Sequence, residues 1–418
     1  MTARLDETAL VKELDALLAD ADAELAHRYP GDAPGRQPVH TVYVPADRFH
    51  AETVPEWGKA AADALAAHGA EPETLASVLR MDQNTVADAL PLVQDKLVAE
   101  PVEDLRIDFE DGLGSIQGGE EDEMAVGAAR SLLAAHSSGA APPWTGIRFK
   151  SLEPATRARG IRTLDLFVGT LATAGDLPGG LVLTLPKVTS VGQVEAMTVV
   201  CQRLEEAYEL GVGQLRFEIQ IETPQAILGP DGTATVARLI HAAPGRLVGL
   251  HYGTYDYSAA LGIAAAQQSL DHPAADHAKA VMQTAAAGTG VRLSDGSTNV
   301  LPVGSSASVH AAWRLHARLV RRALERGFYQ GWDLHPAQLP TRYLATFAFY
   351  RAGAHEASSR LSAYAHGTPG GVLDEPATAQ ALATFLLGGL HCGALRPNEI
   401  GIDEATLRAL VERSAPVR

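Results

Sequence analysis

Short runs of β-branched and aromatic residues alternate along the chain with longer segments that have helical periodicity. Two of these segments, residues 191–210 and 309–324, place an apolar residue at every third or fourth position. Such a stripe predicts a helix that packs one face against a sheet. The short runs predict eight strands, at residues 40–45, 105–109, 146–150, 181–187, 215–222, 246–252, 291–295 and 331–335.

Eight strands that alternate with helices predict an α/β fold, a (β/α)₈ TIM barrel with N-terminal and C-terminal helical extensions. The strands contain nearly continuous apolar residues, so we expect apolar strand bodies, as in parallel strands buried on both faces. No strand is followed by a dinucleotide-binding glycine fingerprint, and no phosphate-binding loop of the GxxxxGK[ST] type occurs. The expected division is an N-terminal helical arm at 1–36, a barrel at 37–353 with a helical insertion at 50–104, and a C-terminal extension at 354–418.

Composition narrows the classes of partner. The 418 residues include 50 acidic and 34 basic ones, which gives a formal net charge of −16 without any basic run of five or more. This balance argues against nucleic acid and anionic membranes as partners. The two cysteines support neither a disulfide framework nor a zinc site. With no apolar stretch of transmembrane length and no signal-peptide pattern, we expect a soluble cytoplasmic protein.

Ionisable residues cluster where the predicted strands end, which is where barrel enzymes have their active sites. Several carboxylates with few nearby Cys or His residues suit a hard divalent cation, Mg²⁺ or Mn²⁺. The planar guanidinium of Arg148 suits a substrate carboxylate. A cation that binds a 2-oxoacid would stabilise an enolate, so the pattern indicates metal-assisted carbonyl chemistry. The residues are Asp108, Glu110, Asp111, Arg148, Lys150, Lys187, Glu222, Asp256, Asp295 and His335.

Some of these side chains have two interpretations. Lys187 could form a Schiff base, but this needs a desolvated amine of lowered pKa, and an electrostatic role beside a metal is favoured. We expect His335, which precedes a proline, to make a structural hydrogen bond. His251 and Asp295 are candidates for the pocket wall, and Cys201 lies on an apolar stripe that we expect in the core.

Motifs in and after the predicted strands carry a resemblance to a known family. In chain order they are TVYVPADR at 41–48, IDFEDG at 107–112, GIRFKS at 146–151, LTLPKVTS at 183–190, IETPQAIL at 221–228, GTYDYSAALG at 253–262, DGSTNVLP at 295–302 and GWDLHPAQ at 331–338. Because these motifs occur in this order, the chain resembles the HpcH/HpaI aldolase/citrate lyase family, which includes citrate lyase β-subunit-like proteins and malyl-CoA lyases. The resemblance covers roughly residues 40–340.

The resemblance implies that Glu222 and Asp256 are metal ligands and that Glu110 and Asp111 hold metal-bound waters. It also implies that Arg148 binds a substrate carboxylate. With these assignments, the catalytic candidates are Arg148, Glu110, Asp111 and Lys187. The substrate-binding candidates are Arg148, Gly253, Thr254 and Asp295.

The predicted function is a Mg²⁺-dependent carbon–carbon lyase or aldolase that acts on a 2-oxoacid or hydroxyacyl-CoA-type substrate through a metal-stabilised enolate. Enzymes of this family often assemble, so we expect a homo-oligomer. Two alternatives stay open. One is a non-catalytic barrel subunit that binds a protein partner, and the other is a phosphoryl-transfer enzyme acting on a phosphoenolpyruvate-type substrate.

Overall fold

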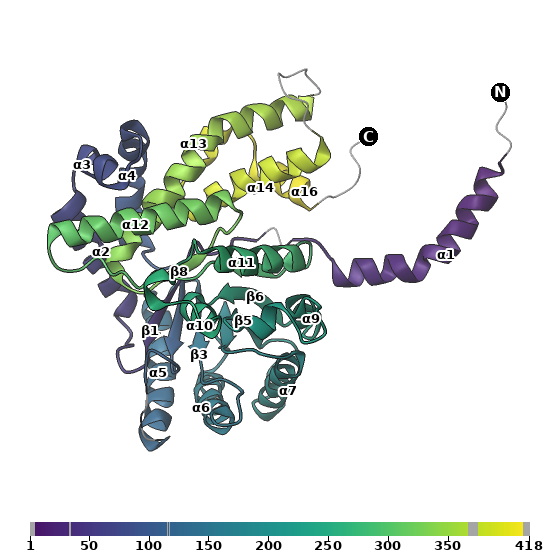
Figure 1. Ribbon diagram of the computed structural model, residues 1–418, viewed down its shortest axis with the longest axis horizontal. Helices are drawn as coiled ribbons and strands as arrows, with labels where there is room; N and C mark the ends of the chain where they lie inside the picture. Colours follow the sequence, from purple (N-terminus) through teal and green to yellow (C-terminus); the bar gives the residue numbers. More distant parts are fainter. Residues whose placement is uncertain (1–4, 33–34, 115, 117, 367–374, 413–418) are drawn as a thin grey trace.

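A computed structural model describes residues 5–32, 35–114, 116, 118–366 and 375–412. Its strands are β1 (His40–Pro45), β2 (Asp104–Asp108), β3 (Trp144–Arg148), β4 (Leu181–Leu185), β5 (Arg216–Ile221), β6 (Leu247–Tyr252), β7 (Arg292–Ser294) and β8 (Gly331–Asp333). They form one parallel sheet in the order β7-β6-β5-β4-β3-β2-β1-β8. The amide of Asp295 donates to the carbonyl of Gln330 at 2.8 Å and nearly closes the ring. The predicted TIM barrel is confirmed (Figure 1).

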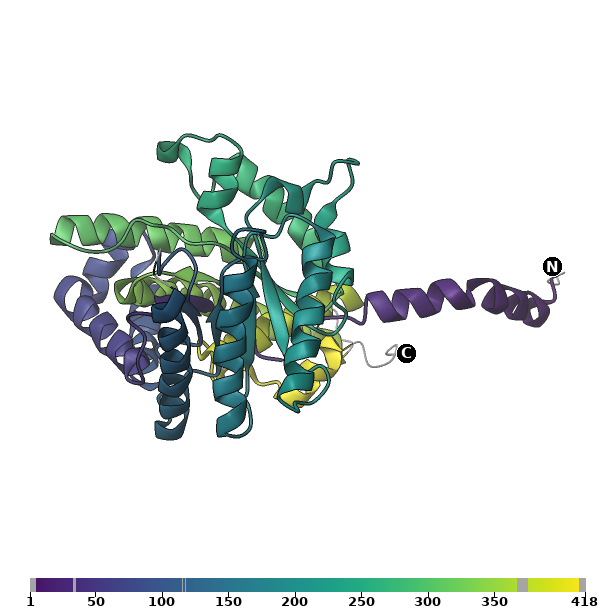
Figure 2. The ribbon, with the colours of Figure 1, turned by 90° about the horizontal axis from the view of Figure 1, so that it is seen from below.

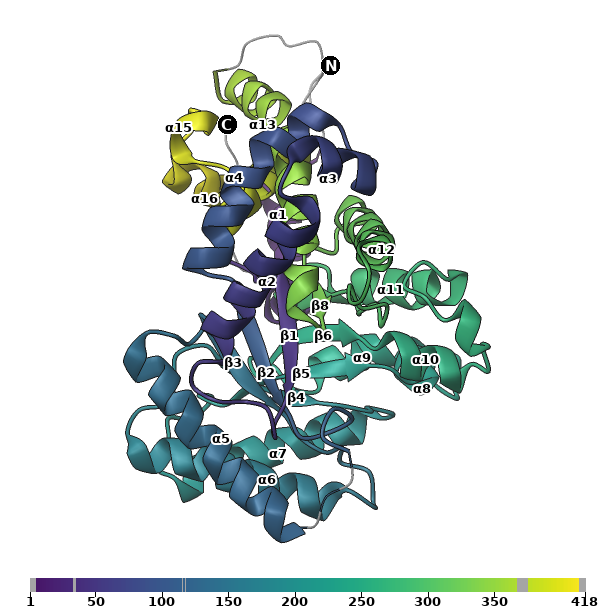
Figure 3. The ribbon, with the colours of Figure 1, turned by 90° about the vertical axis from the view of Figure 1, so that its left-hand side faces the viewer.

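Helices surround this ring of strands. Figure 3 shows α5, α6 and α7 on one side of the strands and α13, α15 and α16 on the other. Helix α13 packs against α4, α12 and α14. The helices are α1 (Glu7–Arg28), α2 (Thr53–Gly69), α3 (Pro72–Leu79), α4 (Gln83–Ala99), α5 (Gly118–Ser138), α6 (Arg157–Ala174), α7 (Val191–Ala207), α8 (Pro224–Ile227), α9 (Thr235–His241), α10 (Thr254–Ala260), α11 (Pro273–Ala286), α12 (Ser306–Glu325), α13 (Leu339–His366), α14 (Pro376–Cys392), α15 (Pro397–Ile400) and α16 (Glu404–Val411), with 3₁₀ turns η1 (Ala265–Gln267) and η2 (Pro336–Gln338).

The two apolar stripes lie against the barrel as predicted. On α7 the buried residues include Val194, Met197 and Cys201, so Cys201 belongs to the core. On α12 they include Val309 and Trp313. Within the described part of the chain, no helix is both long and apolar enough to cross a membrane.

The first helix is placed differently from the others. Helix α1 extends away from the barrel (Figures 1 and 2), and none of its residues is buried. At the other end of the chain, α13 is continuous across residue 353, where the sequence places the end of the barrel domain. The division into arm, barrel and extension stays a prediction.

The expectation of apolar strand bodies is wrong for one face of the strands. Asp104, Arg106, Glu218 and His251 lie within β2, β5 and β6, and all four are buried. Side chains of a strand point alternately to opposite faces, so in a barrel every second residue points inward. The apolar residues of β2 and β5 occupy the alternate positions, at Leu105, Ile107, Phe217, Ile219 and Ile221.

Arg106 neutralises this buried layer. Its Nε and Nη2 donate to the two carboxylate oxygens of Glu218 at 2.9 and 2.8 Å, and its Nη1 donates to Asp104. His251 Nε2 lies 3.0 Å from the same Glu218 carboxylate. Burial acts to raise the pKa of Glu218, but Arg106 and His251 outweigh it and hold the pKa below its usual value. The pairing is necessary because an isolated buried charge would be strongly destabilising.

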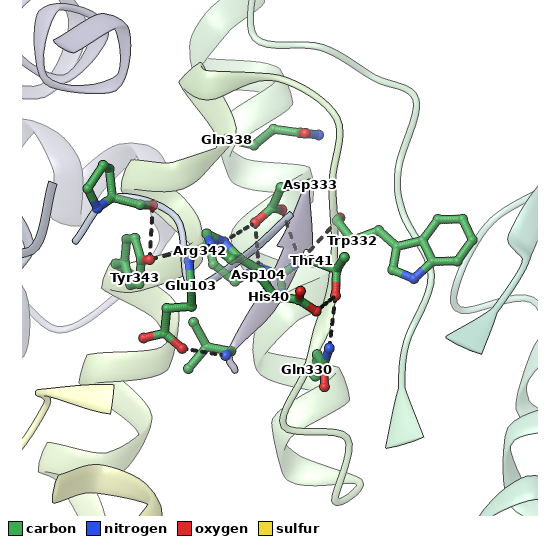
Figure 4. Close-up of polar contacts among 12 residues, drawn as sticks. His40, Thr41, Glu103, Asp104, Gln330, Trp332, Asp333, Gln338, Arg342 and Tyr343 are labelled. Atoms are coloured by element: carbon green, nitrogen blue, oxygen red, sulfur yellow. Dashed lines mark hydrogen bonds and ion pairs between the residues drawn. The ribbon is translucent and has the colours of Figure 1, made fainter. Parts of the chain in front are cut away.

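Another buried carboxylate, that of Asp333, joins β8 to its neighbours (Figure 4). Its Oδ1 accepts from His316 Nε2 at 2.9 Å and from Arg342 Nη2 at 3.0 Å. Its Oδ2 accepts from His40 Nδ1 at 2.9 Å and from Arg342 Nε at 3.0 Å. Burial acts to raise the pKa of Asp333, but Arg342 and the two histidines lower it well below its usual range. One side chain therefore connects β1, β8, α12 and α13.

Replacing this carboxylate should destabilise the fold strongly. In Asp333→Asn an amide group would face two donors, and Arg342 would lose its buried counter-charge. We expect the free energy of unfolding to fall by about 3–5 kcal/mol, the usual cost of breaking a buried pair. Urea unfolding at pH 7 measures the change. The matched control Asp63→Asn removes an exposed carboxylate next to Lys59 and should leave stability nearly unchanged. Equal effects of the two substitutions would contradict the role given to Asp333.

Candidate active site

Lys187 contacts four of the predicted site residues. It lies just beyond β4, and its backbone φ of 54° is in the left-handed region that non-glycine residues rarely adopt. Its Nζ lies 2.7 Å from Glu110 Oε1, 3.1 Å from Asp111 Oδ2 and 3.5 Å from Asp256 Oδ2. Its backbone amide donates to Glu222 Oε1 at 2.6 Å. The structure thus brings together residues that follow β2, β4, β5 and β6.

Arg148, at the end of β3, is held from two sides. Its Nε and Nη2 donate to the two oxygens of Asp108 at 2.7 and 2.6 Å. Its guanidinium carbon lies 4.9 Å from the centre of the Tyr43 ring. The nearest acceptors of Nη1 are Glu110 Oε2 and Gln220 Oε1, both at 3.5 Å. One edge of the guanidinium is therefore occupied, and Nη1 has only long contacts.

Asp108 and Tyr43 are the partners that sequence reasoning did not assign. Asp108 is one of the acidic residues predicted at strand ends. It lies two residues after Arg106, so the alternation of side chains puts it on the same, inward face of β2. Its carboxylate oxygens also accept hydrogen bonds from the backbone N–H groups of Glu110 and Gly112, at 3.0 and 2.9 Å. It therefore fixes both the loop after β2 and the orientation of Arg148.

The electrostatics of the site are dominated by carboxylates. Burial raises the pKa of Glu222 to about 8, although Arg148 and Lys187 act to lower it. Burial also raises the pKa of Glu110, against the same two cations. For Asp111, burial acts upward but the hydrogen bond with Glu110 and the charge of Lys187 outweigh it, so its pKa is lowered. The site holds more carboxylates than cations, and an added cation would stabilise it.

Lys187 itself is held in its charged form. Burial acts to lower the pKa of Lys187, but the hydrogen bond and charge of Glu110 raise it above its ordinary value, with help from Glu222 and Asp111. A Schiff-base lysine needs the opposite shift, because only the neutral amine is a nucleophile. The surroundings of Lys187 therefore favour the electrostatic interpretation.

The residues present fit a magnesium ion. Glu222 and Asp256 offer carboxylate oxygens only, which Mg²⁺ prefers. A Cβ at Gly253 would lie 2.3 Å from Glu222 Cβ and 2.7 Å from its Oε2, so the glycine leaves space beside that oxygen. No group of three or more His, Cys, Asp or Glu side chains with metal-binding geometry occurs among the described residues. Mg²⁺ does not need one, since it often takes one or two carboxylates and keeps its waters.

Other predicted residues have partners of their own. Both oxygens of Asp295 lie 3.0 Å from the Nζ of Lys279, with which it forms a buried ion pair. Thr254 is buried, and its hydroxyl donates to the carbonyl of Ser297 at 3.3 Å. His335 Nδ1 accepts from the amide of Ala337 at 3.1 Å, the structural hydrogen bond that we expected. Contact of substrate with Gly253, Thr254 and Asp295 stays a prediction.

Comparison with protein families gives one match. Residues 18–416 match a family described as "Domain of unknown function (DUF6986)". The chain belongs to this family. None of the curated proteins compared with this DUF6986 member matches it.

Solved structures with the same fold extend the comparison. The DUF6986 chain is similar to a citrate lyase from Burkholderia xenovorans LB400, with 22% identity, a TM-score of 0.56, and coverage of 75% of this chain and 91% of that one. It is also similar to CitE from Mycobacterium tuberculosis in complex with magnesium, acetoacetate and coenzyme A. That match has 17% identity and a TM-score of 0.50, and covers 86% of this chain and 100% of CitE. The resemblance read from the sequence is thus confirmed at the level of the fold.

The raised pKa of Glu222 predicts how stability depends on pH. A carboxyl group with a raised pKa in the folded state adds stability below its ordinary pKa, near 4.5, and this is lost as pH rises through about 8. With a chelator present, the free energy of unfolding of the wild type should fall by a few kcal/mol between pH 5 and 8.5, relative to Glu222→Gln. Urea unfolding at several pH values measures this difference.

The control is Glu195→Gln, on an exposed position of α7. This variant should follow the wild-type pH profile. Added Mg²⁺ at pH 8 should stabilise the wild type and the control but not Glu222→Gln. Parallel pH profiles of wild type and Glu222→Gln would contradict the burial of an ionising group at this position.

Proposed function

We propose that the chain is a Mg²⁺-dependent carbon–carbon lyase or aldolase, acting on a 2-oxoacid or a hydroxyacyl-CoA-type substrate. One observation carries the proposal: basic and acidic side chains meet at the C-terminal ends of β2 to β6, around Lys187. In a TIM barrel this end is where catalysis occurs. The residues involved are Glu110, Asp111, Arg148, Lys187, Glu222 and Asp256.

Glu222 and Asp256 would hold the metal, Mg²⁺ or Mn²⁺. When bound, the ion supplies positive charge that polarises a carbonyl group and stabilises the negative charge left by carbon–carbon bond cleavage. The fold shared with CitE, whose complex contains magnesium, acetoacetate and coenzyme A, supports this assignment. So does the space beside Glu222 that Gly253 leaves.

Arg148 would orient the substrate by binding its carboxylate. The bidentate contact with Asp108 and the ring of Tyr43 hold the guanidinium in one orientation before substrate arrives. This preorganisation avoids an entropic cost at the moment of reaction. Lys187 would keep Glu110 and Asp111 in place, which allows them to bind the metal's waters.

Apolar side chains in the loops beyond the strands support a substrate with an apolar arm, such as an acyl thioester. Loops that follow the C-terminal ends of β5, β6 and β7 expose large apolar residues to solvent. Such residues are common at binding sites when they gather in one region. They are Leu228, Leu261, Val300, Leu301 and Val303.

The remaining sequence predictions belong to the same proposal. Residues 37–353 would form the catalytic domain, with 1–36 and 354–418 as helical additions. A homo-oligomer is supported by α1, which has no buried residue and exposes its leucines, including Leu17 at 75%. Helices in proteins gain most of their stability from packing. Packing of α1 against another copy would cover them.

Oxalate, an analogue of the enolate of pyruvate, tests the metal site. Mg²⁺ and oxalate together should raise the melting temperature of the wild type well beyond the rise with Mg²⁺ alone, because the ternary complex adds the binding energy of oxalate to that of the metal. Oxalate without Mg²⁺ should have little effect. Asp256→Asn should abolish the rise. The matched control Asp95→Asn, on an exposed position of α4, should retain it. Absence of any shift in the wild type would argue for the protein-binding alternative.

Borohydride trapping tests the role of Lys187. Incubation with pyruvate and sodium borohydride should leave Lys187 unmodified in mass spectrometry, because its ammonium is stabilised by Glu110 and is not nucleophilic. An adduct of pyruvate on Lys187 in the wild type would replace the metal-dependent scheme by a Schiff-base one.

A further inference from the structure

A cavity of about 550 Å³ opens at the other end of the barrel, far along the strands from the candidate active site. Its walls come from the first residues of β2 to β7 and from Gln330, which precedes β8. The volume is within the range of small-molecule sites, about 300–1,000 Å³. The N-terminal end of a TIM barrel ordinarily serves stability. A cavity of this size there therefore needs an explanation.

The carboxylates of the inner wall already have hydrogen-bond and ion-pair partners. Arg106 donates to both Asp104 and Glu218, and Thr184 donates to Glu218 at 2.6 Å. The other oxygen of Asp104 accepts from the hydroxyl of Thr41 at 2.9 Å (Figure 4). His251 completes the set at Glu218. These carboxylates thus have hydrogen-bond partners, although burial and the charge of Glu218 raise the pKa of Asp104 above its usual value, against the charge of Arg106.

Two arginines at the mouth of the same cavity lack such partners. Arg216 and Arg292, the first residues of β5 and β7, line the cavity. Within the described ranges no carboxylate lies within the 4.0 Å ion-pair distance of either. Arg292 is partly buried, and its Nη2 contacts the carbonyl of Gly35 at 3.4 Å. Burial lowers the pKa of Arg292, only partly offset by the charge of Asp104.

Arg292 is thus an exception among the arginines of the barrel. The others that are buried at strand positions or against them each have a carboxylate within 3.0 Å, as buried cations usually require. Those arginines are Arg106, Arg148, Arg246 and Arg342. A partly desolvated guanidinium that lines a cavity without a carboxylate in ion-pair contact is suited to binding an anion.

We propose that this cavity is a second ligand site, which binds a small anionic molecule through a carboxylate or phosphate group held by Arg216 and Arg292. Trp144 and Leu177 form the apolar wall for the rest of the ligand. The site is separate from the proposed active site and needs no metal. The proposal of this site goes beyond the proposed function, because ligand binding here does not depend on whether the other end of the barrel is catalytic.

Isothermal titration calorimetry with two probes, inorganic phosphate and malonate, tests the site at constant low ionic strength with a chelator present. The wild type should bind at least one probe with one molecule per chain. Binding of phosphate alone identifies a phosphate-bearing ligand, and binding of malonate alone identifies a dicarboxylate. Arg216→Gln and Arg292→Gln should each weaken binding at least about tenfold, which is about 1.4 kcal/mol.

Matched variants distinguish binding at this site from a general effect of positive charge and from binding at the candidate active site. Arg203→Gln removes an equal charge from an exposed position of α7 and should bind as the wild type does. Asp256→Asn should also bind the probe as the wild type does. Loss of the metal site at the other end of the barrel would therefore leave anion binding in this cavity unchanged. Without ligand, Arg292→Gln should melt at the wild-type temperature or above.

Three outcomes would overturn the proposal. The first is that neither probe binds the wild type, and the second is that Arg292→Gln binds as tightly as the wild type. The third is that Arg292→Gln without ligand melts several degrees lower than the wild type, because Arg292 would then be a structural residue with a partner of its own.

Discussion

The carboxylate of Asp333 has no exposed surface, yet it carries a charge, and the barrel is arranged around that requirement. Four hydrogen bonds reach it, from His40, His316 and Arg342. Each donor belongs to a different element, so β1, α12 and α13 must all be in position before the charge is stabilised. The same constraint recurs at Arg106, which pairs with Asp104 of its own strand and with Glu218 of β5, across the barrel interior. It recurs again at Arg148, which pairs with Asp108 of the neighbouring strand β2. Buried charges in this barrel are tolerated because they are paired.

The fold could be predicted from the sequence because the spacing of apolar residues along the chain differs between strands and helices. The predicted strand at 40–45 coincides with β1, and the one at 331–335 contains β8. The polar layer inside the barrel was not predicted, although RFEIQI in β5 already alternates. Because these strands have an apolar residue at every second position, their sequence pattern is similar to that of strands that are apolar throughout. The alternate, inward positions can hold charges only when partners lie within reach inside the barrel, as Glu218 of β5 does for Arg106 of β2, and this becomes visible only in three dimensions.

The candidate site was predictable in part for the same reason. Residues at strand ends converge in any closed barrel, so the meeting of Glu110, Lys187, Glu222 and Asp256 follows from position in the sequence. Which side chains pair with one another does not follow from position in the sequence. Asp295 sits at a strand end like the others, but Lys279 of α11 holds it. The contact of Arg148 with Asp108 likewise depends on the register of β2 against β3, in which these two residues are directly paired.

The pairing of β1 with β8 has a consequence for how the chain folds. The hydrogen bond from His40 to Asp333 joins residues that are 293 positions apart. During synthesis, β1 is made early and cannot form its pair with β8 until almost the whole barrel has been translated. Until then β1 and β7 are open edges, at which another strand could add. Contacts of such long range slow folding. Nascent chains that stop before residue 331 should therefore aggregate more readily than the complete protein.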